Sequence, residues 1–222
     1  MKAMILAAGR GQRMMPLTQN TPKPLLKIGN KPLIVWHIER LAQAGIKEII
    51  INHAYLGSQI EQALGSGEQW GVGIQYSPEK VALETAGGIA NALPLLGESP
   101  FLVINGDVFS EIDLSLKLQK PYLAHLVMVD NPPQHPQGDF VLDKGILKSD
   151  GPNKLTFSGV GVYSPQLFKG VVKGDSAKLA PLLKSAMSKN LVSGEHFHGL
   201  WHDIGTPERL TQIDDIVRNA LS

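Results

Sequence analysis

The sequence predicts an α/β protein with a central mixed, mainly parallel sheet that is covered by helices on both faces. Two observations support this prediction: several short segments are continuously apolar, and segments with helical apolar spacing lie between them. Continuously apolar strands are typical of sheets buried on both faces. Their alternation with helices favours parallel pairing, because parallel neighbours need a crossover connection.

The first half of the chain alternates strands and helices. Residues 2–8 form the first expected strand, and a long loop follows it. Leu33, Ile34 and Leu41 follow helical spacing until Gly45, which predicts a helix that ends there. The other elements expected in this half are strand 48–53, helix 56–64, strand 72–76, helix 86–93 and strand 101–105.

The pattern changes at about residue 110, where short strands divided by Gly and Asp replace the regular alternation. We expect strands in the run LVMVD and around Phe140 and Leu155, and therefore a mixed sheet. Thr206 is the expected N-cap of a C-terminal helix. The elements expected here are strand 160–163, helix 177–187, strands 191–198 and 200–203, and helix 207–220.

Composition limits the domain count and the partners. With 222 residues and 43% hydrophobic content, the chain can bury a good core, and we expect one domain over residues 1–222, with subregions 1–110 and 111–222. Lys and Arg number 21 against 20 Asp and Glu, so no basic surface indicates nucleic acid or an anionic membrane. The start MKAMILAAG resembles a signal peptide, but its apolar run is too short and Arg10 and Arg13 follow it at once. No apolar run could span a bilayer. The absence of cysteine fits a reducing compartment, and we expect a cytoplasmic protein.

The loop after the first strand carries the strongest functional signal. Gly9 and Gly11 lack Cβ atoms, so the backbone can turn sharply there and direct N–H groups at anionic oxygens. Arg13, and Lys23 between two prolines, add full positive charges. Structureless loops of this length are usually functional. Alone, either cation is more often a solvated surface residue, but together in one loop they predict phosphate binding.

The residue pattern of this loop excludes two familiar classes of phosphate-binding loop. A dinucleotide-binding fingerprint needs a third glycine where this chain has Met14, and an acidic residue where its second strand ends in Asn52 and His53. A Walker loop needs Gly-Lys-Ser/Thr, which is absent from this loop. The loop is therefore of another class.

Two aspartates follow expected strands. Asp107 comes directly after the apolar run FLVI and Asn105-Gly106, where ligands bind in open α/β sheets; the alternative is that Asn-Gly forms a hairpin turn. Asp203 lies between a strand and a helix start, where a capping role with Thr206 is the alternative. A pair of carboxylates at strand ends can hold Mg²⁺, which prefers oxygen ligands.

The segments LAAGRGQRMMPLT and TPKPL resemble the signature of the sugar-1-phosphate nucleotidyltransferases. Within that family, the spacing of INHAYLGSQI, LETAGGI, INGDVF, FSGVGVY and DIGTPERL most resembles the N-acetylmuramate-1-phosphate uridylyltransferases. The resemblance implies a three-layer, Rossmann-like nucleotidyltransferase fold. It also implies UTP and a sugar 1-phosphate as substrates, pyrophosphate as a product, and Mg²⁺ held by Asp107 and Asp203.

The resemblance also implies roles for individual residues, with Arg13 and Lys23 as the catalytic pair. Glu79 could accept a hydrogen bond from uracil or from guanine, and Thr85 is either a neighbour of the base or a helix N-cap. The nucleotide would be bound by Ala8, Gly9, Gly11, Gln12, Arg13, Lys23, Glu79, Gly87, Gly88 and Asn105, where the small residues let backbone amides approach a flat ring. The sugar phosphate would be bound by Asn105, Gly138, Asp139, Ser158 and Gly159.

Three alternatives stay open at this point. Mannose-1-phosphate guanylyltransferases and glucose-1-phosphate nucleotidyltransferases share the loop and the Asn-Gly-Asp pattern. A non-catalytic sugar-nucleotide sensor or assembly subunit would not need both cations and both aspartates. His196, His198 and His202 invite a zinc site, but without HExxH or cysteine we expect them to line a polar face. We expect a monomer or a weak homo-oligomer.

Overall fold

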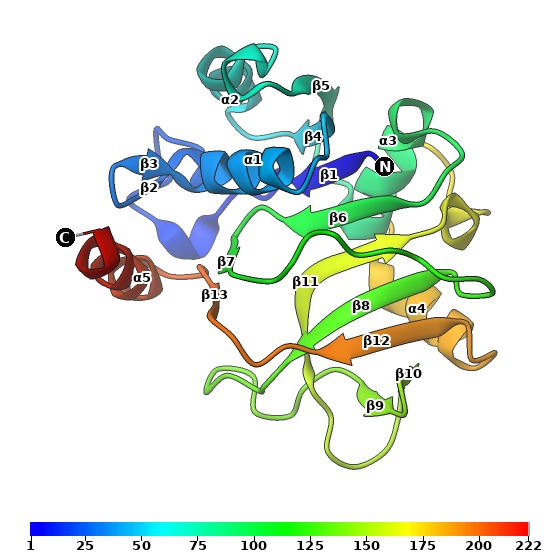
Figure 1. The fold of residues 1–222 in the computed structure, drawn as a ribbon. Helices are drawn as coiled ribbons and strands as arrows, with labels where there is room; N and C mark the ends of the chain where they lie inside the picture. The colour runs from blue at the N-terminus through cyan, green and yellow to red at the C-terminus, as the bar shows by residue number, and fades with distance from the viewer. Residues whose placement is uncertain (222) are drawn as a thin grey trace.

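The centre of the molecule is a nine-stranded sheet with the order β5-β4-β1-β6-β11-β8-β12-β10-β9 (Figure 1). The computed structural model describes residues 1–221, with only the backbone of Leu221. Parallel pairing joins β5, β4, β1 and β6, and also β8 and β12. Because only β11 and β10 run against their neighbours, seven of the nine strands described in this sheet point the same way. The predicted mixed, mainly parallel sheet is confirmed.

The first half follows the predicted order closely. Its long loop is not structureless, because short 3-10 helices and a small hairpin subdivide it. The sheet strands are β1 (Ala3–Leu6), β4 (Glu48–His53), β5 (Gly73–Pro78) and β6 (Phe101–Asn105), and the α-helices are α1 (Leu33–Gln43), α2 (Gly57–Leu64) and α3 (Glu84–Leu96). The loop contains η1 (Gln12–Met14), η2 (Lys23–Leu25), β2 (Lys27–Ile28) and β3 (Lys31–Pro32), and η3 (Glu68–Trp70) precedes β5.

The second half departs more from prediction. The strand expected around Phe140 corresponds to β9 (Val141–Asp143), and those expected around Leu155 and at 160–163 form one longer strand over residues 156–163. Phe140 and Leu155 themselves form an isolated bridge. Strand β10 (Ile146–Lys148), which pairs with β9 in a hairpin, was not predicted. The remaining strands are β7 (Val108–Ser110), β8 (Ala124–Val129), β11 (Thr156–Tyr163), β12 (Val192–His196) and β13 (Trp201–Asp203). The remaining helices are η4 (Pro165–Phe168), α4 (Leu179–Met187) and α5 (Pro207–Leu221).

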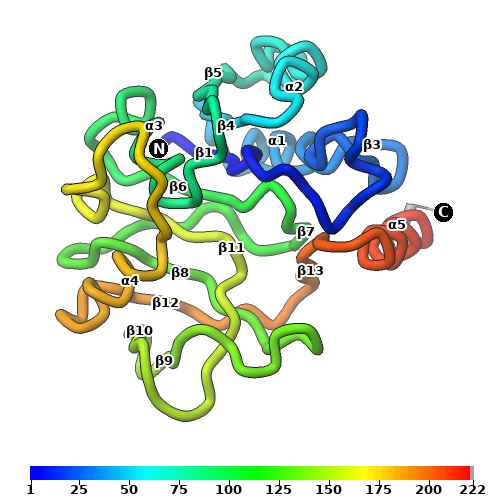
Figure 2. The backbone as a smooth tube through the Cα atoms, turned by 180° about the vertical axis from the view of Figure 1, so that it is seen from behind, coloured from blue at the N-terminus to red at the C-terminus, as the bar shows by residue number. Residues whose placement is uncertain are grey.

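Helices cover both faces of the sheet, which gives three layers. Alternating strand residues point to opposite faces: Ile5 and Ile49 join a core with α1 and α2, whereas Met4 and Ile50 join a core with α3 and α4. Figure 2 shows α3 and α4 on the face opposite α1. The segment between β7 and β8 crosses the α1 face in place of a helix (Figure 1).

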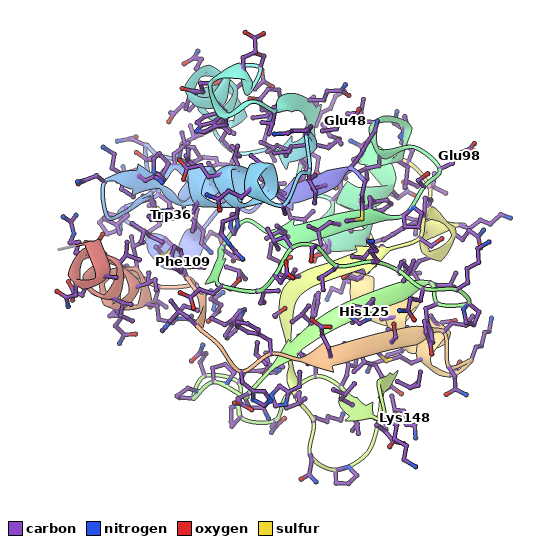
Figure 3. All side chains as sticks on the ribbon, in the orientation of Figure 1. Trp36, Glu48, Glu98, Phe109, His125 and Lys148 are labelled. Atoms are coloured by element: carbon purple, nitrogen blue, oxygen red, sulfur yellow. The ribbon has the colours of Figure 1, made fainter. Side chains whose placement is uncertain are left out.

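A third apolar cluster fixes the C-terminal helix beside the N-terminal loop. The backbone N–H of Gly29, between β2 and β3, donates to Asp214 of α5 at 2.6 Å. Trp36 of α1 and Phe109 of β7 meet edge to face at 5.5 Å between ring centroids (Figure 3). Because α5 follows β13, this cluster ties the glycine-rich loop to both β7 and β13. The fully buried members are Met14, Ile28, Leu33, Ile204 and Ile213.

None of the helices in residues 1–221 combines the length and the hydrophobicity that a bilayer crossing requires.

Candidate active site

The glycine-rich loop lines a cavity of about 570 Å³ at the carboxyl ends of β1 and β6. This is where ligands bind in open α/β sheets, and the volume lies within the usual range for small-molecule sites. The structure therefore brings together seven residues proposed from the sequence. They are Gly9, Gly11, Gln12, Arg13, Lys23, Asn105 and Asp107.

Local packing holds the loop in this shape. Gly11 has a φ of +65°, and a Cβ there would lie 3.2 Å from Cβ of Lys23. The hydroxyl of Thr18, which is buried, donates to the carbonyl of Gly11 at 2.8 Å. Met14 is fully buried among residues of α1 and α5. A side chain at position 11 would therefore disturb both the backbone turn and the placement of Lys23.

Lys23 and Asp107 form an ion pair across this cavity. The ammonium Nζ lies 2.7 Å from the carboxylate Oδ2, and the side chains are 11% and 41% exposed, respectively. Lys23 begins η2 directly after Pro22. The pair joins the loop after β1 to the turn after β6, although 84 positions separate the two residues.

The turn that carries Asp107 is not a hairpin. Gly106 donates its N–H to the carbonyl of Leu6 at 2.9 Å, and a Cβ on Gly106 would lie 2.5 Å from that oxygen. The following strand β7 pairs with β13 rather than with β6. The glycine thus allows a close approach to β1, and the chain leaves the main sheet at Asp107.

Asp203 lies beside Asp107 because β13 pairs with β7. Asp203 is opposite Val108 in this ladder, and the N–H of Ile204 donates to the carbonyl of Asp107 at 2.7 Å. Its carboxylate contacts the guanidinium of Arg209 and accepts from Gln134 at 2.7 Å. The N-cap of α5 is Thr206, whose hydroxyl accepts from the N–H of Arg209 at 3.4 Å. Asp203 is therefore not required as the cap.

Both aspartates line a second cavity of about 240 Å³. Their oxygens match the ligands that hard divalent cations prefer, so this donor set fits the cation implied by the sequence. Asn105 and Asp107 line this cavity and the 570 Å³ cavity as well. They form the common wall between the two spaces.

A third cavity of about 310 Å³ adjoins the first, and Leu6, Gly9 and Thr85 line both. Ala8 and Glu79, two proposed contacts of the base, line the third cavity. Thr85 lies inside α3, for which Leu83 is the N-cap residue, so its interpretation as a cap is wrong.

Glu79 is 7% exposed and both of its carboxylate oxygens accept hydrogen bonds. One accepts from Nδ2 of Asn52 at 2.7 Å, and the other from the N–H of Leu83 at 2.9 Å. Asn52 in turn accepts from the N–H of Ala7 at 2.9 Å. Asn52 was not among the site residues predicted from the sequence. The feature that could have indicated it is its position, since it is a polar residue near the end of an apolar strand that pairs with β1.

The reason proposed for Gly87 and Gly88 needs correction, because neither lines any of the three cavities within the described part of the chain. Gly87 donates its N–H to the carbonyl of Ala177, and a Cβ there would lie 2.3 Å from the carbonyl of Asp175. A Cβ on Gly88 would lie 2.8 Å from both Asn52 and Glu79. These glycines allow close packing behind the cavity wall rather than the approach of a ring to their amides.

Of the residues proposed to bind the sugar phosphate, some line a cavity and others have a backbone role. Asp139 and Ser158 line the 240 Å³ cavity. Gly138 and Gly159 do not line it, and their φ angles of +62° and +83° indicate a backbone role instead. A Cβ on Gly159 would lie 2.7 Å from the side chain of Asn105, so this glycine gives Asn105 its space.

Asp139 also organises the loop around this cavity. Its Oδ2 accepts from the N–H of Phe157 at 2.8 Å, and its Oδ1 lies 3.1 Å from Nε2 of His135. Sequence reasoning missed Trp201, whose indole N–H donates to the carbonyl of Ser158 at 2.9 Å. An aromatic residue two positions before Asp203 was the available signal. The other wall residues that were missed are Val108, Pro132, Gln134, His135, Thr156 and Phe157.

Two histidines near the aspartates, His37 and His202, do not add charge at neutral pH. His37 in α1 is 2% exposed, and burial, with a contribution from Arg40, lowers its pKa to about 4. Burial also lowers the pKa of His202 in β13. His53, at the end of β4, forms a hydrogen bond between its Nε2 and Oε1 of Glu61 at 2.7 Å. The charges that face the 570 Å³ cavity therefore come from Arg10, Arg13, Lys23 and Asp107.

Comparisons with known proteins agree with this architecture. The chain is 57% identical to an N-acetylmuramate alpha-1-phosphate uridylyltransferase from Neisseria meningitidis serogroup B, over 96% of each chain. It is 30% identical to a mannose-1-phosphate guanylyltransferase catalytic subunit beta from Danio rerio, over 94% of this chain and 62% of that protein. A crystal structure of a UDP-glucose pyrophosphorylase complexed with UDP-glucose superposes with a TM-score of 0.79 at 20% identity, over 99% of this chain and 98% of the other, and shows the same fold.

The sequence model of one family, described as nucleotidyl transferase, matches residues 2–219. That match spans the glycine-rich loop, both aspartates and all three cavities. The three-layer fold, the loop and the family model lead to one conclusion: this chain belongs to the nucleotidyl transferase family.

Proposed function

We propose that this protein transfers a uridylyl group from UTP to N-acetyl-α-muramate 1-phosphate, giving UDP-N-acetylmuramate and pyrophosphate. The observation that carries the reaction class is the common wall of Asn105 and Asp107 between two adjoining cavities. Two anionic substrates need such adjacent sites when a nucleotidyl group passes from one to the other. The choice of substrates is supported by the 57% identity to a uridylyltransferase over nearly the whole chain.

The three cavities suggest one arrangement of the substrates. The triphosphate would follow the loop from Gly9 to Arg13, and the base would enter the 310 Å³ cavity beside Ala8 and Glu79. The sugar 1-phosphate would enter the 240 Å³ cavity, where Asp139 and Ser158 lie. Because Asn52 and Leu83 already hold the carboxylate of Glu79, its geometry is fixed before the nucleotide binds.

The reaction needs alignment and charge neutralisation more than proton transfer. An oxygen of the sugar phosphate attacks the α-phosphorus of UTP, a new P–O bond forms, and the bond to the β-phosphate breaks as pyrophosphate leaves. The attacking oxygen is already an anion near pH 7, so no general base is required. Arg13 and Lys23 would offset the repulsion between the two polyanions and stabilise the charge of the in-line transition state.

Asp107 and Asp203 are the residues that would hold Mg²⁺. When bound, the ion neutralises phosphate charge and helps to hold the reacting groups in line. Lys23 and Arg209 neutralise the two carboxylates in the structure described here. Lys23 therefore has two partners available, the carboxylate of Asp107 and the phosphates of a bound nucleotide.

Guanylyl transfer to mannose 1-phosphate is the closest rival, and the Danio rerio relative supports it at lower identity. Glu79 does not separate uridylyl from guanylyl transfer, because a carboxylate can accept a hydrogen bond from either base.

We also propose that the protein is a cytoplasmic monomer or weak homo-oligomer, organised as one domain, and that it takes part in cell-wall recycling. Sedimentation of the purified chain would test its oligomeric state.

A substrate panel tests the proposal. The purified protein is supplied with Mg²⁺, each of four nucleoside triphosphates and several sugar 1-phosphates, and pyrophosphate release is measured. We expect the highest kcat/KM with UTP and N-acetylmuramate 1-phosphate. Turnover only with GTP and mannose 1-phosphate would contradict the choice of substrates. Nucleotide binding without pyrophosphate release from any sugar phosphate would instead indicate a sensor.

A further inference from the structure

We propose that Asp130, His196 and His198 form a binding site for a transition metal ion of the zinc class. Asp130 follows the end of β8, and His196 is the last residue of β12. These strands are parallel neighbours, and His196 is opposite Met128, so their ends lie side by side. One potential ligand atom from each of the three residues falls within 4.8 Å of the others.

The contact between His196 and Asp130 is the first argument for a cation. Nε2 of His196 lies 2.9 Å from Oδ1 of Asp130. This nitrogen is shielded from solvent, yet the angles give it no hydrogen bond in the described structure. When the ring proton is on Nδ1, the lone pair of Nε2 faces a carboxylate lone pair, which is unfavourable. A cation that both atoms can bind removes this repulsion.

His198 supplies a third ligand at the same place. Its ring centroid lies 3.9 Å from that of His196, with 47° between the ring planes. Zinc ligands lie about 2.0–2.2 Å from the ion, so ligand atoms in a tetrahedral site are about 3.4 Å apart. The pair at 2.9 Å and the limit of 4.8 Å for the group bracket this spacing, so only small adjustments are needed. Asp130 is 78% exposed, and small side-chain rotations can supply this movement. A coordinating water would complete a four-coordinate ion.

The donor set separates this site from the aspartate pair. Two imidazoles and one carboxylate suit Zn²⁺, and also Ni²⁺ or Cu²⁺, whereas Mg²⁺ prefers oxygen ligands. The inference is independent of the proposed reaction. His196 and His198 lie beside Asp130, which follows β8, whereas His202 lies in β13 next to Asp203.

The position of the site gives it a structural consequence. Asp130 begins the segment that continues through Gln134 and His135 to Asp139, and these three residues line the 240 Å³ cavity. An ion bound at Asp130 would attach the start of this segment to the end of β12. The wall of the cavity and the proposed metal site are thus parts of one connected segment.

Zinc affinity tests the proposal. The full chain, freed of metal, is titrated with Zn²⁺ against a chromophoric chelator, with excess Mg²⁺ and without nucleotide. We expect one zinc ion per chain. His198→Gln and Asp130→Asn should each weaken binding by about 10-fold or more, the loss that even an outer-shell partner can cause. Zinc-edge anomalous diffraction should place the ion among the three side chains.

His135→Gln is the matched control. Nε2 of His135 also lies close to a carboxylate oxygen, Oδ1 of Asp139, at 3.1 Å. Among the described residues, however, this pair is not part of any group of three potential metal ligands. Its zinc affinity should equal that of the unchanged protein. Equal affinity in all four proteins, or an equal loss in His135→Gln, would overturn the proposal. Thermal unfolding of each variant excludes misfolding as the cause of a loss.

Discussion

The proposed nucleotide half and the proposed sugar half of the cleft are formed by different kinds of structure. In the nucleotide half, most of the wall of the 570 Å³ cavity comes from one continuous segment, from Leu6 to Pro24, at the end of four parallel strands. In the sugar half, the wall of the 240 Å³ cavity comes from four short segments around residues 105–108, 132–139, 156–158 and 201–203. The parallel sheet gives way to mixed pairing in this half.

This difference determines how each half can recognise a ligand. The nucleotide half offers a turn, backbone amides and three cationic side chains, which suit phosphates whatever the base. In the sugar half, polar side chains support one another: Asp139 holds Phe157, and Trp201 holds Ser158. We therefore expect substitutions in the first half to affect chemistry and those in the second to affect the binding of one substrate.

Asp107→Asn should have the largest effect, because Asp107 is on the wall common to both halves. Loss of the negative charge removes a proposed metal ligand and the partner of Lys23, so kcat should fall by about 10³-fold or more. Steady-state pyrophosphate release measures the change. Asp113→Asn, which alters an exposed aspartate outside the three cavities, is the control and should leave kcat unchanged.

A near-normal rate for Asp107→Asn would contradict the proposal that Asp107 acts at the wall common to both halves. The thermal unfolding temperature should change little, because the carboxylate is 41% exposed and its interactions are partly screened by solvent.

Lys23→Ala tests the nucleotide half alone. Removal of the ammonium should lower kcat by roughly 10²-fold, comparable with the loss of one transition-state donor, while KM for the sugar phosphate changes little. Lys27→Ala is the matched control, since Lys27 is an exposed lysine four positions later in β2. A larger change in KM for the sugar phosphate than in kcat would show that Lys23 acts in the other half.

Trp201→Ala should have the smallest effect of the three and tests the sugar half. Loss of the indole opens the wall of the 240 Å³ cavity, and KM for the sugar phosphate should rise by about 10-fold, equivalent to roughly 1.4 kcal/mol. KM for UTP should stay constant. Trp201→Phe keeps an aromatic wall but loses the hydrogen bond to Ser158, so it separates the two contributions. An equal rise in both KM values would mean that the halves are not independent.

The strands of the first half of the chain could be predicted from the sequence more accurately than those of the second half. The expected strands 48–53 and 101–105 coincide with β4 and β6, because each contains an apolar run, Ile49–Ile51 or Phe101–Ile104, that is followed by an asparagine. Strand β10 was missed, since it has three residues, of which only Leu147 is buried. Local pattern decides the first kind of strand, and contact with distant residues decides the second.

The candidate site shows a similar contrast at single residues. Gly11 could be interpreted from its neighbours, because its role is a backbone conformation that the loop itself requires. Gly87 and Gly88 could not, because the atoms that exclude a Cβ belong to Asn52, Glu79 and Asp175, which approach only in the folded chain. The glycines correctly indicated that other atoms approach the backbone closely, but these atoms belong to the protein itself rather than to a ligand ring.

The sequence by itself determined the alternation of strands and helices, the phosphate-binding character of the loop and the family resemblance, since all three are properties of contiguous residues. Tertiary structure alone decided that Lys23 meets Asp107, that β13 brings Asp203 beside it, and that Asp130 rather than His202 joins His196 and His198. The physical reason is that strand order and register set these distances. Both depend on how the whole core packs, which no short segment encodes.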